Sequence, residues 1–272
     1  MNKKYSNTIK LFISGLVLLT LFAPPALADD PRARAIMEKV DARDDGDNQT
    51  SDMEMILIDK RGRQRVRKIA SFSKDKGNDT YRLMFFQRPA DVKDTAFLTW
   101  DYDDPERDDD QWLYLPALRK TKRIASSDKS GSFMGSDLNY ADMTDRNLAD
   151  YEFFLKKEMA VKGVKAWLIE SIPVSKKVIR ETGYTKSLLI VRQDNFFVIR
   201  AVHWIKDGGY LKYFDVKTLE QIDGIWVATE IHVTKKKGKK LAHKTILKFK
   251  NVKFNQELEF DEFTVRRMEK GL

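Results

Sequence analysis

IWVATEIHVTKKKGKKLAHKTILKF, residues 225–249, carries the pattern that decides the fold class. Apolar side chains and one threonine recur at alternate positions on both sides of the lysine run: Ile225, Val227, Ile231, Val233, Leu241, Thr245, Leu247 and Phe249. Successive side chains of a strand point to opposite faces of its sheet, so this period predicts two half-buried strands. Gly238 stands where the chain has to turn between them. The stretch therefore predicts an antiparallel hairpin.

Turn signals divide most of the remaining chain into similar short runs. Arg61-Gly62, Lys162-Gly163, Gln193-Asp194-Asn195 and Asp207-Gly208-Gly209 each separate two apolar or alternating stretches. We expect roughly ten or eleven strands and no strand–helix–strand rhythm. The predicted fold class is mainly β (α+β), built on one wide antiparallel sheet. Because a sheet of this width curls or splits, its concave apolar face needs a cover, which helices, a loop or a ligand can supply.

A short helix is predicted ahead of the strands. Asp30 is a good N-cap residue, and Pro31 fits the first turn that follows it. Ala33, Ile36, Met37 and Val40 then form one apolar stripe at helical spacing, and the run RDDGDN at 43–48 ends the helix.

The first 28 residues have the order of features found in a secretory signal peptide. Lys3 and Lys4 precede the mostly apolar run 9–23, and two prolines then lead to Ala26-Leu27-Ala28, an A-x-A cleavage site. We expect cleavage after Ala28, export to the bacterial periplasm, and a single domain over residues 29–272; a retained N-terminal anchor is the alternative. The chain contains no Cys, which excludes a disulfide and a lipidated cysteine.

The charge balance is basic, with a formal net charge of +9. Five lysines of the central hairpin turn are candidates for docking: Lys235, Lys236, Lys237, Lys239 and Lys240. They either protect a solvated sheet edge or attract anionic lipid or an acidic partner protein. Export argues against nucleic acid as the partner.

Motifs of enzymes and metal sites are missing from the sequence. Gly131 and Gly135 lack the lysine of a P-loop, and there is no nucleophile elbow, no Cys nucleophile and no H-E-x-x-H. Glu230 and His232 supply at most half of a zinc site. The acidic run 101–110 does not fit a calcium loop, so we interpret it as a solvated hairpin tip. We therefore predict no catalytic activity, cofactor or metal.

The stretch WLYLPALRKTKRIASSDKSGSFMGSDLNYADM, residues 112–143, does not look like a plain linker. Its ordered features are Tyr114-Leu115-Pro116, Arg119, Arg123, a Ser-rich run, Phe133, Gly135-Ser136-Asp137, Tyr140 and Asp142. In these features it resembles the LolA-like proteins, the family of outer-membrane lipoprotein-sorting proteins. The resemblance implies a half-open β-barrel with helices or loops plugging its mouth. It also implies a carrier of lipid or lipid-modified cargo between the inner and outer membranes, working with an RND-type inner-membrane exporter; a cargo-free adaptor of a transporter is the alternative.

Candidate residues of the lipid cavity and its lid are apolar or aromatic: Met53, Met55, Leu57, Met84, Phe86, Trp100, Trp112, Tyr114, Phe133, Met134 and Tyr140. Phe133 and Met134 are interpreted either as a gate that swings on Gly131 and Gly135 or as simple loop anchors. Arg119 and Arg123 are expected to meet a head group or to pair with Asp137 or Asp142.

Overall fold

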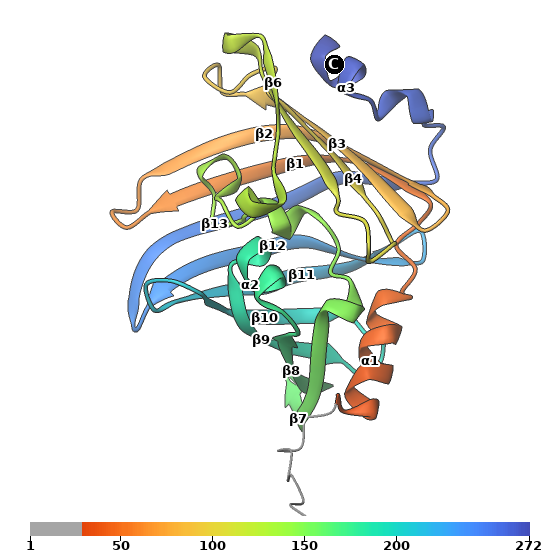
Figure 1. Cartoon of the computed structure of the whole chain (residues 1–272), viewed down its shortest axis with the longest axis vertical. Coiled ribbons are helices and arrows are strands. Elements are labelled where there is room, and N and C mark those ends of the chain that lie inside the picture. The colour runs from red at the N-terminus through yellow and green to blue at the C-terminus, as the bar shows by residue number, and fades with distance from the viewer. Residues whose placement is uncertain (1–28) are drawn as a thin grey trace, which may run out of the picture.

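The computed structural model describes residues 29–272, so the predicted signal peptide lies outside the described residues. Its main feature is one antiparallel sheet of thirteen strands in the order β6-β5-β4-β3-β2-β1-β13-β12-β11-β10-β9-β8-β7 (Figure 1). The strands are β1 (Asn48–Asp59), β2 (Gln64–Lys76), β3 (Asp79–Arg88), β4 (Ala96–Asp101), β5 (Asp110–Leu115), β6 (Lys120–Arg123), β7 (Tyr151–Val161), β8 (Val164–Pro173), β9 (Tyr184–Arg192), β10 (Val198–Ile205), β11 (Tyr210–Ile222), β12 (Ile225–Lys237) and β13 (Lys240–Phe254).

The sheet is strongly curved and stays open, because β6 and β7 form its two edges (Figure 1). Each strand pairs with a neighbour in the sequence except at the β1–β13 pairing, which joins the two halves of the chain. The predicted fold class, mainly β with a half-open curved sheet, is confirmed. The chain forms more strands than the alternation indicated.

The hairpin that decided the fold class forms as predicted. β12 ends at Lys237, β13 begins at Lys240, and Gly238 turns between them with φ +56°, a backbone region that favours glycine. Val233 and Leu247 on the inner face are buried, whereas Lys244 and Lys248 of β13 are on the other face.

Three α-helices accompany the sheet: α1 (Pro31–Asp41), α2 (Lys176–Thr182) and α3 (Val265–Lys270). The side chain of Asp30 accepts hydrogen bonds from the backbone N–H groups of Arg32 and Ala33, so the predicted cap of α1 is present. α1 packs beside β7, and α3 lies on the outside of β4 and β5 (Figure 1). No helix of the described residues is long and apolar enough to span a membrane.

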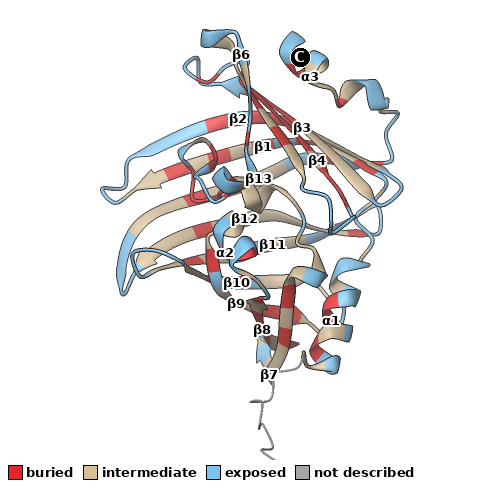
Figure 2. Cartoon of the chain, viewed as in Figure 1, coloured by how far each residue is buried: buried red, intermediate tan, exposed pale blue. Residues whose placement is uncertain are grey.

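Residues 124–150 connect β6 to β7 and occupy the inside of the curve, in front of β1 and β13 (Figure 1). This connection, here called the plug segment, contains four 3₁₀ helices, at Ser126–Asp128, Phe133–Gly135, Tyr140–Met143 and Leu148–Asp150. Buried residues run along the strands behind it (Figure 2). The plug segment therefore supplies part of the cover that the concave face requires.

Candidate functional site

The concave face has a filled half, where the plug segment packs against β1–β5. Phe133 is completely buried there, and its ring centroid lies 4.9 Å from that of Phe97, 5.7 Å from that of Tyr140 and 6.2 Å from that of Phe86. The same cluster contains Met55, Ile69 and Leu113 from the sheet and Leu138 from the plug segment. These contacts make the filled half a packed core.

Polar contacts also fix the plug segment to the sheet. The buried carboxylate of Asp137 lies 2.6 Å from Nδ1 of His243 and accepts a hydrogen bond of 2.8 Å from Thr245. Further along, Asp142 accepts hydrogen bonds from Lys212 at 3.0 Å and from Tyr184 at 2.7 Å. Buried charge-assisted hydrogen bonds are strong, so the segment is held at several points along its length.

The other half of the concave face is hollow. A cavity of about 1030 Å³ lies between α1, the end of the plug segment and the inner faces of β7–β12. Its floor is apolar and includes Phe153, Leu189, Ala201, Phe214, Val216, Ala228 and Ile231. This volume is at the upper end of the range for small-molecule pockets. The hollow half is therefore the candidate binding site.

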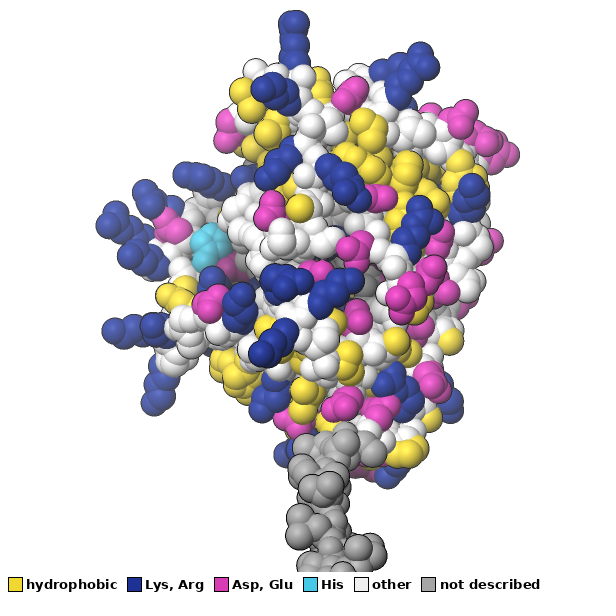
Figure 3. Space-filling model, viewed as in Figure 1, with side chains coloured by type: hydrophobic (Ala, Val, Ile, Leu, Met, Phe, Trp, Pro, Cys, Tyr) yellow, Lys and Arg dark blue, Asp and Glu magenta, His cyan; other side chains and the backbone are white. Residues whose placement is uncertain are grey.

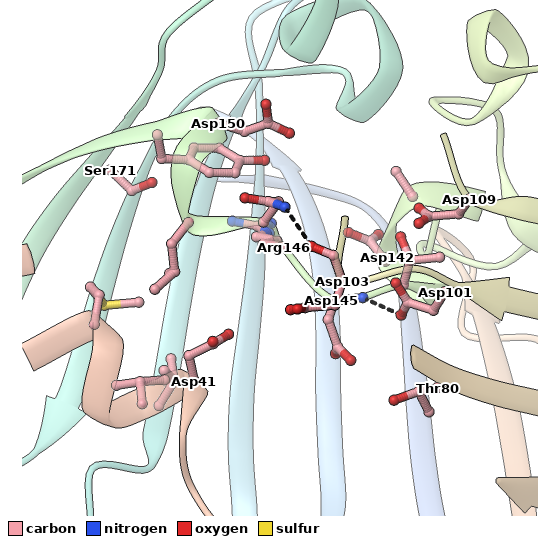
Figure 4. A pocket seen from close by; sticks show the side chains of 18 of the residues that line it. Asp41, Thr80, Asp101, Asp103, Asp109, Asp142, Asp145, Arg146, Asp150 and Ser171 are labelled. Atoms are coloured by element: carbon pink, nitrogen blue, oxygen red, sulfur yellow. Dashed lines mark hydrogen bonds between the residues drawn. The ribbon is translucent and has the colours of Figure 1, made fainter. Parts of the chain in front are cut away.

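The mouth of the cavity is acidic, as the close view in Figure 4 shows for several of its carboxylates. They come from the end of α1 and the connection after it, the ends of β2 and β4, the β4–β5 turn, the plug segment and α2. The lining contains twelve acidic residues: Asp41, Asp45, Asp75, Asp101, Asp103, Asp104, Asp108, Asp109, Asp142, Asp145, Asp150 and Glu181. It contains five basic ones: Arg43, Arg107, Lys129, Arg146 and Lys177.

Two carboxylates of the mouth share one guanidinium. Arg82 donates to Asp101 and, at 2.7 Å, to Asp145. Burial, followed by the charge of Asp145, raises the pKa of Asp101 to about 7. One cation does not neutralise two carboxylates, so the group keeps an excess of negative charge at neutral pH.

Other carboxylates of the mouth are also costly to ionise. Burial, together with Asp145 and Asp103, raises the pKa of Asp41. Burial is likewise the main cause that raises the pKa of Asp45 and the pKa of Asp150. A cation placed among these groups would relieve their repulsion, so the mouth favours positive charge.

The floor contains one buried histidine that is held neutral. Ser187 lies 2.7 Å from Nδ1 of His203, and the ring stacks on Tyr184 at a centroid distance of 4.5 Å. Burial, with the positive charges of Arg146 and Lys212, lowers the pKa of His203 well below its ordinary value. This side chain therefore adds a polar but uncharged group to the floor.

The structure separates the eleven cavity candidates into two groups on opposite faces. Eight lie in the filled half, in or against its packed cluster: Met53, Met55, Leu57, Met84, Phe86, Phe133, Met134 and Tyr140. Met84 also lines a smaller hollow of about 230 Å³ next to the plug segment. Within residues 29–272, the lining of the large cavity includes none of the eleven.

Trp100, Trp112 and Tyr114 require a correction. They lie on the convex face, in a cluster with Phe263 and Met268 of the C-terminal segment. Trp100 Nε1 donates a hydrogen bond of 2.9 Å to the carbonyl oxygen of Phe263. Alternation along β4 and β5 turns these side chains away from the methionines of β1, so the expectation of one shared lining is wrong for them.

The charged candidates also differ from the expected pairings. Arg123 donates to Asp110 through Nε at 2.8 Å, instead of reaching Asp137 or Asp142. Arg119 is exposed at the β5–β6 turn with φ +47°. Lys237, Lys239 and Lys240 are exposed at the β12–β13 turn, as expected for that hairpin. The acidic run 101–110 forms the exposed β4–β5 hairpin tip, as interpreted, and also lines part of the cavity mouth.

The candidate site residues that the sequence did not reveal are the apolar side chains of the floor. Phe153, Ala201 and Val216 belong to strands that were recognised, yet no motif marks them as a site. The dense carboxylates of the β4–β5 turn were the one available signal for the mouth.

Comparisons with known proteins agree with this architecture. A family model whose description reads "uncharacterized protein" matches residues 78–270. The chain is similar to a DUF1329 family protein from Desulfovibrio piger, with 29% identity over 89% of this chain and 99% of the other and a TM-score of 0.81. It is also similar to a domain from Vibrio parahaemolyticus described as an outer membrane lipoprotein-sorting protein domain, with 29% identity, coverage of 88% and 98%, and a TM-score of 0.79.

A LolA superfamily protein from Nitrosomonas europaea shares the fold, with 19% identity, coverage of 86% and 98%, and a TM-score of 0.65. A search of the curated proteins gave no match. The family model covers most of the chain, and the solved relatives match it over nearly their whole length. The chain therefore belongs to the LolA-like family.

Proposed function

We propose that this protein binds lipid or lipid-modified cargo in the hollow half of its sheet and carries it through the periplasm. The observation that carries the proposal is the cavity of about 1030 Å³ with an apolar floor. An acyl chain gains ~0.8 kcal/mol for each buried CH₂ group, so such a floor holds a chain by burial alone. Carriage of this kind needs no covalent chemistry, and we infer that the protein acts without catalysis.

The charges of the mouth indicate which kind of head group the cargo carries. With a chain in the floor, the head lies in a lining that has twelve acidic side chains against five basic ones. An anionic head would be repelled there, whereas a cationic amine would be attracted. We therefore infer a cargo with an amine at its polar end.

The relatives support the general class of this function. The Vibrio protein is named for outer membrane lipoprotein sorting, and the predicted signal peptide is that of an exported protein. The proposal includes an RND-type inner-membrane exporter that donates or accepts the cargo, because the family resemblance implies such a partner.

Two measurements on the mature protein test the proposal. The first is mass spectrometry of an organic-solvent extract, in which we expect co-purified lipid. The second is titration with three amphiphiles that share a twelve-carbon chain and carry an ammonium, a carboxylate or a sugar head. We expect all of them to bind in the floor and the ammonium to bind tightest. Equal affinities would remove the head-group inference and leave the cavity assignment intact.

A variant that fills the floor tests the place of binding. Ala228 lines the cavity, so Ala228→Phe is expected to reduce binding of every probe at least tenfold by occupying the space of the chain. Ala160→Phe, on the exposed end of β7, is the matched control and leaves binding unchanged. A protein that carries no lipid and takes up no probe would be the cargo-free adaptor instead.

A further inference from the structure

The basic charge of the protein is concentrated at one end of the sheet. The β1–β2, β12–β13 and β10–β11 turns are carried by six consecutive strands, β2-β1-β13-β12-β11-β10. The pairs Asp59–His243 and Tyr210–Lys237 place these turns at the same end of the strands. Residues 59–65, 206–210 and 235–244, here called the basic rim, contain eleven Lys and Arg and two Asp.

The rim accounts for the whole positive excess of the described chain. Three of the 50 Lys and Arg lie in residues 1–28, so residues 29–272 carry 47 basic and 41 acidic side chains, a net charge of +6. The rim alone carries +9, which leaves the rest of the described chain at −3. Figure 3 shows the Lys and Arg side chains gathered at the left of the molecule, where Figure 1 places the β1–β2 and β12–β13 turns.

The rim also carries the apolar and aromatic side chains that suit an interface with lipid. Leu241 is 42% exposed beside the lysines of the β12–β13 turn. The ring of Tyr210 lies 4.8 Å from Nζ of Lys235 and 5.4 Å from Nζ of Lys237. Long lysine stems and a tyrosine ring place an apolar body against a bilayer and keep the polar end at the head groups.

We propose that the basic rim docks this protein on the surface of an anionic lipid bilayer. Its cations are mostly lysines, which act as flexible point charges and do not impose the fork geometry that arginine uses to recognise a carboxylate or phosphate. They are spread over three adjacent turns, which matches an extended charged surface better than a single acidic group. This surface is independent of the cavity and of the proposed cargo.

The opposite charge at the other end of the strands sets the orientation. β1 and β2 run from the rim to the acidic mouth, and a strand of twelve residues spans about 40 Å. That distance is several Debye lengths at physiological salt, so the two ends act separately. An anionic bilayer attracts the rim and repels the mouth, which then faces away from the membrane. Resting on the proposed function, this orientation would have cargo pass through the mouth to or from another protein.

Co-sedimentation of the mature protein with vesicles tests the proposal. We expect binding to vesicles that contain about a third phosphatidylglycerol in phosphatidylcholine, no binding to pure phosphatidylcholine, and loss of binding at high salt. The variant Lys237→Gln/Lys239→Gln/Lys240→Gln is expected to lower the partition coefficient roughly a hundredfold. The control Lys157→Gln/Lys165→Gln/Lys176→Gln removes the same charge from exposed positions outside the rim and changes it much less.

Three results would overturn the proposal. One is absence of binding to the anionic vesicles. Another is an equal decrease of vesicle binding in the two triple variants, which would indicate that binding responds to net charge alone. The third is rim-dependent capture by an acidic periplasmic protein without any vesicle binding. Circular dichroism confirms that each variant is folded, and the amphiphile titration is expected to be unchanged in both triple variants because the rim lies outside the cavity.

Discussion

The two halves of the concave face differ in what covers their apolar side chains. In the filled half the chain covers its own sheet, because Phe133, Leu138 and Tyr140 of the plug segment pack against large side chains of β1–β5. In the hollow half Met37 of α1 packs in a buried cluster with Phe153 and Leu189, and a cavity of about 1030 Å³ remains between α1, the end of the plug segment and the floor. One curved sheet thus supplies a rigid support and a binding site.

The comparison shows which residues mark a site in such a fold. Large apolar side chains gather where the chain packs against itself, because close packing there stabilises the protein. The hollow half contains large apolar side chains too, such as Phe153 and Phe214, and what distinguishes its lining is the set of carboxylates that the protein leaves only partly compensated. Large apolar side chains alone therefore do not distinguish the binding site from the packed core, whereas the carboxylates of the mouth do.

The largest expected effect tests whether the filled half is permanent core. Phe133→Ala removes a completely buried ring, so we expect the free energy of unfolding to fall by about 3–5 kcal/mol while probe binding in the hollow half stays unchanged. Urea unfolding and amphiphile titration measure the two quantities. A gate would behave in the opposite way, with faster probe uptake and little loss of stability. Met134→Ala, at a partly exposed neighbour, is the milder control.

The boundary between the halves provides the next test. Asp142 of the plug segment pairs with Lys212 of β11 at 3.0 Å, and their side chains are 5% and 6% exposed. Asp142→Asn leaves the ammonium of Lys212 buried without its carboxylate, which we expect to cost about 3 kcal/mol.

The same variant predicts a pH dependence of definite sign. Burial already lowers the pKa of Lys212, and Asp142 opposes that shift. In the variant the folded state holds the Lys212 proton less tightly than the unfolded state does, so its stability rises with pH below about 10. The double variant Asp142→Asn/Lys212→Met is expected to be more stable than the single one. A double variant that is further destabilised would show that the pair is not what joins the halves.

A smaller effect concerns the mouth of the hollow half. The pKa of Asp101 is raised to about 7, above its unfolded value of about 4. Between these values the folded state keeps a proton that the unfolded state has released, so stability falls as the pH rises from about 4 to 7. Asp145→Asn removes one cause of the raised pKa, and we expect it to recover roughly 1–2 kcal/mol at pH 7 relative to pH 5.

Urea unfolding at several pH values measures this slope in the parent and the variant. Asp223→Asn, at the exposed β11–β12 turn and outside the cavity lining, is expected to leave the slope unchanged. Saturating the protein with the twelve-carbon ammonium probe should reduce the slope, because a cation in the mouth lowers the pKa of Asp101. If the parent and Asp145→Asn had identical slopes, Asp145 would not raise the pKa of Asp101. The head-group inference would then lose the charge coupling on which it depends.

Most of the fold was readable because alternation and turns are local signals. The hairpin of β12 and β13 and the cap of α1 by Asp30 formed as expected from single short stretches. The missed elements are short. β6, with the sequence KTKR, contains no apolar residue, and α2 has only seven residues although Ser175 and Gly183 cap it. β6 forms because it pairs with β5, and α2 forms because Val178 is buried against the rest of the protein. Neither contact can be recognised from the local sequence.

The site was harder to predict from the sequence, because a cavity forms where no side chain or segment fills the space. No local pattern in β9 or β10 indicates that Leu189 and Ala201 line a cavity. Predicting the lining also required knowing which alternate positions of each strand face inward, since neighbouring side chains of a strand lie on opposite faces of the sheet. That uncertainty explains why the tryptophans of β4 and β5 were grouped with the wrong face.

The smallest effect tests that correction. Trp100→Phe keeps most of the apolar contact with Trp112, whose ring centroid is 4.8 Å away, and removes the hydrogen bond to the carbonyl oxygen of Phe263. We expect a loss of about 1 kcal/mol in unfolding free energy and no change in affinity for any amphiphile. Ligand-induced change in the emission of Trp100, or a changed affinity in the variant, would place this side chain in contact with cargo. In that case the convex face beneath the C-terminal segment, and not the hollow half alone, would take part in binding.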